Sequence, residues 1–322
     1  IQILPQPYVS CPMLALISSV LPSMTIVFVG VIADKILQPD LRTLSRLTLY
    51  ILSPALITDV LYRTQMSGAS ALGLTVGFTL NYLALWGVGW VMGRGFNLSP
   101  ATRTSLIATT TFPNTGNMGL SVSLFALGDI GLDRATVVLL VSSILVFSTG
   151  PALLRGEGWR SSLLFTLRLP LIWAVLLGLL LRGMVTLWGD GVGSALPLDL
   201  DRALNLLAQA TIPMALLMLG MQISRYPIRL SGYTLGASLL RLVGGCAIGA
   251  VMSTIVGLKG IDQQVLILQC SMPAAVTSFV MANEVGGDGA RTGQVVALST
   301  LISFVTVPIV LWGLRELVPL QP

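Results

Sequence analysis

Charged residues are scarce in this chain, and histidine is absent. Asp, Glu, Lys and Arg make up 10% of the 322 residues, against about 25% in a typical soluble domain. Without histidine the chain lacks the commonest proton shuttle and metal ligand. The cysteines Cys11, Cys246 and Cys270 have no metal-ligand spacing and are an odd number for disulfide pairing. We therefore expect no metal and no cofactor.

Apolar residues dominate the rest of the composition. They make up 54% of the chain, and the mean hydropathy is +0.87. The sequence therefore predicts an all-α polytopic membrane protein in contact with lipid. The 18 Lys and Arg exceed the 13 Asp and Glu, but no basic cluster occurs, so we expect no nucleic-acid partner.

Ten apolar runs approach the roughly 20 residues that a spanning helix needs, and turn-forming residues separate them. We number them predicted spans 1 to 10, at residues 13–33, 43–62, 70–93, 101–127, 132–154, 163–186, 202–223, 231–257, 262–285 and 291–314. The loops after spans 1, 3, 5, 7 and 9 hold eleven of the 18 Lys and Arg residues, the opposite side holds six, and Arg241 lies within a span. The positive-inside rule then places both termini outside, and we expect the protein in the plasma (inner) membrane.

The two halves of the chain repeat the same features in the same order. In predicted spans 5 and 10 one pattern recurs at identical intervals, with Arg134, Ser142, Ser143, Phe147, Thr149 and Pro151 matched by Arg291, Ser299, Thr300, Phe304, Thr306 and Pro308. Because each half has five spans, the second half must enter the membrane from the opposite side. The sequence thus predicts a five-plus-five inverted repeat, the architecture of many secondary transporters, whose site lies at the midplane.

Predicted span 4 contains a motif that interrupts a helix. Within Phe112–Ser121, Pro113 stands in mid-span and is succeeded by two glycines and two asparagines. Proline lacks an N–H and clashes with the preceding turn, and glycine loosens the turn after it. An interrupted backbone at membrane depth is stable only where its free groups face protein, water or a ligand. We interpret this break as half of a substrate site.

The repeat predicts a matching break in predicted span 9, at Met272–Ser278, with Pro273 in mid-span. If the two breaks cross, helix N-termini near the bilayer centre offer N–H groups to an anion, most simply a carboxylate. The alternative is that both prolines only kink packed helices. The predicted crossover residues are Pro113 and Pro273, and the predicted substrate-binding residues are Asn114, Thr115, Gly116, Asn117, Gln269, Val276 and Thr277.

Three charged residues are candidates for electrostatic or coupling roles. Arg241 lies deep in predicted span 8, either as an anion-attracting group or as a structural partner of helix C-termini or of Glu284. Asp59 and Glu284 are carboxylates near span ends. Each either carries a proton that is coupled to transport or is simply a solvated residue. Gln269 is likewise either a ligand or a packing contact.

The broken spans also resemble a known family. Pro113–Thr115 with Met118–Leu120 is similar to the fourth-helix signature of the auxin efflux carrier family, and Pro273–Glu284 resembles its ninth helix. Arg241 before a glycine-rich stretch resembles its eighth helix. The family includes plant auxin exporters and bacterial permeases for malate or malonate.

The resemblance implies a two-domain fold similar to that of the bile-acid/sodium symporters. Residues 1–62 and 163–223 would form a scaffold domain, and residues 70–154 and 231–314 a transport domain. It implies that Asn114 meets the substrate carboxylate, and it leaves open a homodimer formed through the scaffold. Asn117 and Ser121 depart from the family pattern, and both make the site more polar.

Our leading hypothesis is a secondary transporter, a permease or efflux carrier, of small organic anions such as auxin-like compounds or dicarboxylates, working by elevator-type alternating access. With few buried carboxylates, uniport driven by the membrane potential is favoured over proton coupling. The alternatives are a sodium-coupled symporter of the bile-acid type and a non-transporting intramembrane sensor or enzyme. An enzyme is disfavoured because no base lies near the serines in sequence. Substrate, direction of transport, coupling and oligomeric state stay open.

Overall fold

Helices make up the regular structure of the described residues, which are 12–155, 170–188, 198–226, 228–284 and 286–318 of this computed structural model. The elements are α1 Pro12–Leu37, α2 Leu41–Leu47, η1 Thr48–Leu52, α3 Ser53–Arg63, α4 Gly68–Gly95, α5 Pro100–Thr111, η2 Thr115–Gly119, α6 Leu120–Arg155, α8 Pro170–Trp188, α9 Leu198–Arg225, α10 Gly232–Leu239, η4 Leu240–Gly244, α11 Gly245–Ile255, α12 Gly260–Cys270, α13 Val276–Glu284 and α14 Gly289–Leu317. The η segments are π-helical. The predicted all-α class is confirmed for these ranges.

Eight helical stretches of the described chain are long and apolar enough to cross a membrane. The protein is therefore an integral membrane protein, as its composition predicts. Predicted spans 4 and 9 are missing from this set as single helices, because α5 ends at Thr111 and α12 ends at Cys270. Both interruptions fall where proline and small residues predict a break.

The boundary between predicted spans 4 and 5 lies where the sequence predicts it. The sequence places a short loop at 128–131, and within α6, Leu120–Arg155, two helical segments meet at a kink at one non-helical residue. That residue is Gly128, at φ 69° and ψ −164°. Glycine reaches this conformation without a Cβ clash, so the chain changes direction there without a separate loop.

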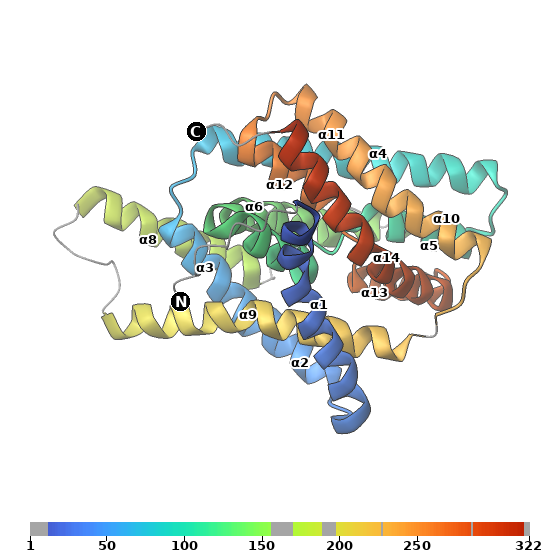
Figure 1. The fold of residues 1–322 in the computed structure, drawn as a ribbon, viewed down its shortest axis with the longest axis horizontal. Coiled ribbons are helices and arrows are strands. Elements are labelled where there is room, and N and C mark those ends of the chain that lie inside the picture. The colour runs from blue at the N-terminus through green and yellow to red at the C-terminus, as the bar shows by residue number, and fades with distance from the viewer. Residues whose placement is uncertain (1–11, 156–169, 189–197, 227, 285, 319–322) are drawn as a thin grey trace.

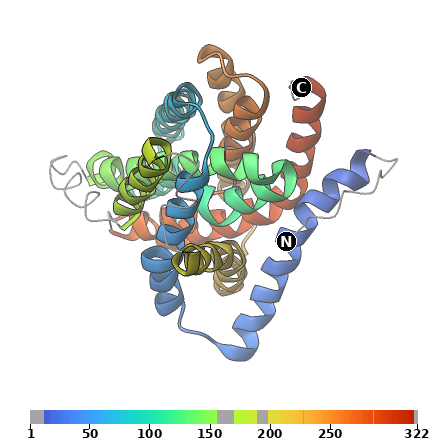
Figure 2. The same cartoon turned by 90° about the vertical axis from the view of Figure 1, so that its left-hand side faces the viewer.

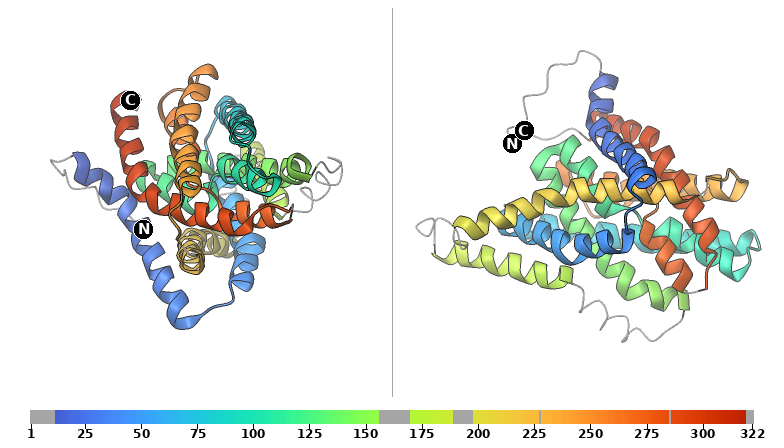
Figure 3. Two further views of the ribbon diagram at one scale, coloured as in Figure 1. Left: turned by 90° about the vertical axis from the view of Figure 1, so that its right-hand side faces the viewer. Right: turned by 90° about the horizontal axis from the view of Figure 1, so that it is seen from below.

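Figure 1 shows α9 along one edge of the molecule and α4 and α10 toward the opposite edge, with α6 between them. Helix α1 packs along α9, and α3 packs against both α8 and α9. Helices α1 and α14 are also in contact, which Figures 2 and 3 show from opposite sides.

Close glycine packing joins α1 to α9. A Cβ on Gly220 would lie 2.0 Å from the carbonyl oxygen of Val27 and 2.9 Å from the Cα of Gly30. Only a residue without a side chain fits this approach, as at other close helix contacts in membranes. The buried core continues from here through Leu219 to Met118 of η2, so the first break is held directly against the α1–α9 pair.

Candidate functional site

The first break consists of three residues between α5 and η2. Phe112 is extended, at φ −99° and ψ 95°, because a residue before proline disfavours the α region. Pro113 comes next, and Asn114 caps the N-terminus of η2. The Phe112 ring is buried and stacks on Tyr82 with 5.9 Å between ring centroids, which anchors the break in the α4–α5 packing.

The second break, Ser271–Ala275, separates α12 from α13 and pairs with the first. The backbone N–H of Asn114 donates to the carbonyl oxygen of Pro273 at 2.8 Å, and the N–H of Ala275 donates to that of Phe112 at 2.9 Å. These two bonds form an isolated antiparallel bridge. The backbone groups that each break frees are thus partly satisfied by the other break, which a membrane interior requires.

The side chain of Asn114 is held by one of its two polar atoms. Its Oδ1 accepts a hydrogen bond from the backbone N–H of Asn117 at 3.1 Å, the usual bond of an N-cap asparagine. Its Nδ2 is buried and has no hydrogen-bond partner among the described residues. Because the cap fixes the amide orientation, Asn114 keeps one buried donor available.

A cavity of about 440 Å³ lies against the two breaks. Of the predicted site residues, its wall brings together Pro113, Asn114, Thr115, Gly116, Asn117, Val276 and Thr277. Residues of η1, α9 and the start of α8 also line the cavity, and α6 contributes Ser142 and Ser143. Most of the other lining side chains are apolar, as in small-molecule pockets generally.

Gln269 and Pro273, although predicted for the site, do not line this cavity. Gln269 is fully buried, and its Nε2 donates to Ser123 Oγ at 3.0 Å. A Cβ on Gly119 would lie 2.2 Å from Gln269 Oε1, so Gln269 packs directly on η2. Its Oε1 lacks a partner in the described chain.

Arg241 is completely buried on the π-helical segment η4. Its Nη1 donates to the carbonyl oxygen of Thr110 and its Nη2 to that of Cys270. These carbonyls lie at the C-terminal ends of α5 and α12, where the helix dipole is negative. A Cβ on Gly245 would clash with both Arg241 and Cys270. The contacts are those of a structural partner, and Arg241 is outside the cavity wall.

Of the two candidate carboxylates, Asp59 is separate from the cavity. Asp59 is buried, forms an ion pair with Arg63 at 2.8 Å, and accepts from Asn205 Nδ2 at 3.1 Å. Glu284 is the last residue of α13, and its side chain lies outside the described residues.

The sequence analysis did not single out the α9 wall. Thr211, Ala215, Met218 and Gln222 of α9 line the cavity. Their spacing of four, three and four residues places them on one helix face. That spacing could have identified these four residues as one helix face. It could not have shown which elements line the cavity together with that face.

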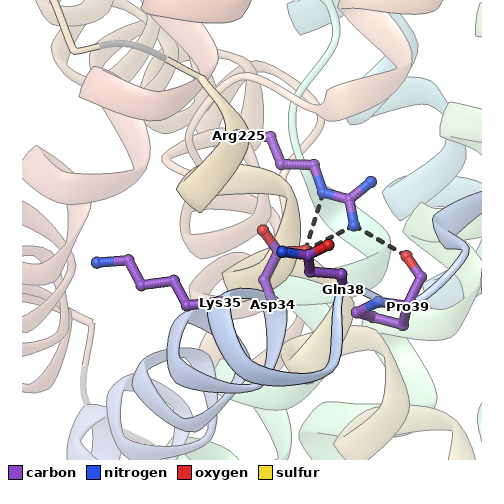
Figure 4. A pocket seen from close by; sticks show the side chains of 5 residues that line it. All are labelled: Asp34, Lys35, Gln38, Pro39 and Arg225. Atoms are coloured by element: carbon purple, nitrogen blue, oxygen red, sulfur yellow. Dashed lines mark hydrogen bonds and ion pairs between the residues drawn. The ribbon is translucent and has the colours of Figure 1, made fainter.

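A second cavity, of about 550 Å³, lies where α1 and α9 end (Figure 4). There Arg225 donates twice to Asp34, at 2.9 and 2.6 Å, and once to the carbonyl oxygen of Pro39 at 2.9 Å. The Lys35 side chain points away from this pair. The Asp34 carboxylate is already paired, and none of the described residues that line this cavity has a buried polar side-chain atom without a partner.

The spanning helices and the cavity between them define the class, an integral membrane protein with a small-molecule cavity among its helices. The chain belongs to the family described as membrane transport protein, whose profile matches residues 15–163 and 159–311. It is therefore a membrane transporter, which is not an enzyme class. The match confirms the resemblance to the auxin efflux carrier family.

Curated relatives carry transporter names. A protein of Methanothermobacter thermautotrophicus named "Uncharacterized transporter" is 28% identical over 289 residues, 86% of this chain and 89% of its own. An uncharacterised transporter of Methanocaldococcus jannaschii is 25% identical over 280 residues, 84% of this chain and 88% of its own. A protein of Rhizobium meliloti named "Putative malonate transporter" is 25% identical over 321 residues, 92% of this chain and 95% of its own.

Proposed function

We propose that this transporter carries small organic anions and holds the substrate carboxylate in the 440 Å³ cavity beside Asn114. The malonate in the name of the Rhizobium meliloti relative belongs to the same chemical class. The cavity is small enough to select for small organic molecules, and auxin-like compounds and dicarboxylates both fall within this class.

The buried donor of Asn114 carries this proposal. A buried polar group without a partner costs about 1–3 kcal/mol, and Asn114 Nδ2 is such a group. A carboxylate in the cavity supplies the missing acceptor. The N-terminus of η2 adds a positive dipole end to the same wall, although the N–H groups of Thr115 and Asn117 already donate to Pro113 and to Asn114 Oδ1. A neutral amide donor also binds an anion weakly enough to release it.

The architecture that we propose has the two predicted domains. Residues 1–62 and 163–223 form the scaffold domain, and residues 70–154 and 231–314 form the transport domain. The chain has ten spans, arranged as a five-plus-five inverted repeat. Pro113 and Pro273 mark the crossing of the two broken spans. In this division the cavity lies between the domains, since α9 belongs to one and both breaks belong to the other. An elevator motion of the transport domain would expose it to either side.

We place the protein in the plasma (inner) membrane with both termini outside. It works as a uniporter in this proposal, and a homodimer formed through the scaffold domain is the expected assembly. The substrate gradient sets the direction of transport in this scheme. Arg241 acts as the structural link between the breaks, and Asp59 and Glu284 are not required for uniport.

The test is uptake by the purified protein in proteoliposomes. We expect flux of one or more of indole-3-acetate, malate, malonate and small monocarboxylates, stimulated by a membrane potential that is positive on the receiving side. Protein-free liposomes and neutral analogues are the controls. Flux of cationic or neutral solutes alone would contradict the proposal.

A sodium-coupled symporter is the second candidate, and one observation favours it. Gln269 Oε1 is a buried oxygen without a partner in the described chain, and it lies beside η2; sodium takes oxygen ligands. One oxygen is a small part of a cation site, so uniport remains our first choice. A sodium gradient that accelerates anion uptake at constant membrane potential would favour the symporter instead.

A further inference from the structure

The cavity wall contains two buried side-chain atoms without hydrogen-bond partners in the described chain. One is the donor Asn114 Nδ2, and the other is the acceptor Gln222 Oε1. The breaks supply the first and α9 supplies the second. The two atoms are therefore complementary in kind and lie on different parts of the wall.

The other polar members of the α9 face already have partners. Thr211 Oγ1 donates to the carbonyl oxygen of Leu52 at 2.9 Å, and Met218 Sδ accepts from Thr48 Oγ1 at 3.2 Å. Gln222 occupies the next position on this face. The packing of α9 against η1 thus satisfies its neighbours and leaves Gln222 alone unsatisfied on that face, among the residues that the structure describes.

The Ser143 hydroxyl of the cavity wall does not supply the missing donor. Ser143 Oγ donates to the carbonyl oxygen of Leu139, at 2.8 Å, within its own helix. Serine in membrane helices commonly bonds its own backbone in this way. The described chain supplies no donor for Gln222 Oε1, and the cavity that Gln222 lines is the space from which a ligand can supply one.

We propose that the substrate is an organic anion that also carries a hydrogen-bond donor away from its carboxylate, a hydroxyl or N–H group, and that Gln222 accepts from this donor. The proposal rests on the proposed function, because Asn114 is taken to bind the carboxylate. Gln222 then sets specificity. A ligand with only acceptors leaves Gln222 unsatisfied, and one with a second carboxylate at this position places acceptor against acceptor.

Matched pairs of anions test the proposal. Malate differs from succinate by one hydroxyl, and indole-3-acetate differs from 1-benzothiophene-3-acetate by an N–H group in place of the ring sulfur. With the full-length protein in proteoliposomes, we expect the donor-bearing member of at least one pair to be preferred by about tenfold in kcat/KM, the effect of one hydrogen bond to a buried group.

The Gln222→Met variant should remove that preference, since methionine is similar in length to glutamine but has no amide oxygen to accept from the substrate's donor. Gln209→Met is the matched control, because Gln209 is exposed on the same helix and outside the cavity wall. The control variant should keep the preference.

The outcomes separate the two proposals. Transport of anions without preference in either pair, or a preference that survives Gln222→Met, would overturn the role of Gln222 and leave the proposed function standing. A protein that moves neither member of either pair, and no other anion of the uptake panel, contradicts the proposed function, and the role of Gln222 falls with it.

Discussion

The backbone N–H of Asn114 donates to the carbonyl oxygen of Pro273 at 2.8 Å, across 159 positions of sequence. This bond joins the two interrupted helices at the point where each lacks regular backbone pairing. The same residue also contributes its side chain to the cavity wall. Asn114 holds the breaks together through its backbone, caps η2 through Oδ1, and keeps Nδ2 unpaired within the described chain.

Asn114→Asp separates the capping role of this residue from its donor role. Aspartate still accepts from the Asn117 N–H, and its negative charge suits a helix N-terminus, so we expect the fold to be retained. The variant lacks the Nδ2 donor and repels an anion. Anion uptake should fall by at least about tenfold, measured in proteoliposomes.

Asn205→Asp is the control for that variant. Asn205 lies on α9 outside the cavity wall and donates to Asp59, so this change should leave anion uptake unaffected even if it lowers stability. Equal uptake by the Asn114→Asp variant and the unmodified protein would place the carboxylate elsewhere.

Arg241→Met should destabilise the protein. Arg241 is the charged group that bonds the C-terminal carbonyls of both α5 and α12, and hydrogen bonds to charged groups contribute about 1.5–3 kcal/mol each. We expect a loss of about 3 kcal/mol or more, seen as a lower midpoint of thermal unfolding in detergent. Arg315→Met, at an exposed position in the last turn of α14, should leave the midpoint unchanged. An unchanged midpoint with lost anion uptake would instead assign Arg241 to substrate attraction.

Local chemistry explains the features that the sequence could predict. A proline in mid-span interrupts a helix. The breaks at Pro113 and Pro273 could therefore be predicted from the sequence. The position of Asn114 at the start of the next helix could be predicted for the same local reason, because asparagine is a preferred N-cap residue. The all-helical membrane class could be inferred from composition alone.

Tertiary contacts explain the features that the sequence could not predict. Gln222 and Thr211 are both polar residues of α9, but Thr211 Oγ1 bonds the carbonyl oxygen of Leu52, just before α3, at 2.9 Å, in addition to that of Leu207 in its own helix at 3.3 Å. Gln269 was expected near the substrate, yet its Nε2 bonds Ser123. The two partners of Arg241 come from α5 and α12, which no local pattern connects to η4.

The α1–α9 contact should tolerate no added side chain. Gly220→Ala places a Cβ 2.0 Å from the carbonyl oxygen of Val27, and overpacking of this kind costs about 1–3 kcal/mol. We expect a lower midpoint of thermal unfolding in detergent. Gly183→Ala on α8 is the matched control, since a Cβ there meets nothing within 4 Å. Equal midpoints for the two variants would show that α1 and α9 can move apart at no cost.

The proposed orientation predicts opposite labelling of two exposed loop positions. Arg42 and Ser67 are exposed on the loops after predicted spans 1 and 2, and the excess of Lys and Arg puts the first in the cytoplasm. In a background with Cys11, Cys246 and Cys270 replaced by alanine, Ser67→Cys should react in intact cells with a membrane-impermeant maleimide. Arg42→Cys should react only after the membrane is permeabilised, which also shows that its thiol is accessible. The reverse pattern would place both termini in the cytoplasm and invert the proposed topology. The antiparallel pairing of the two breaks would be unaffected, because it depends on contacts within the chain.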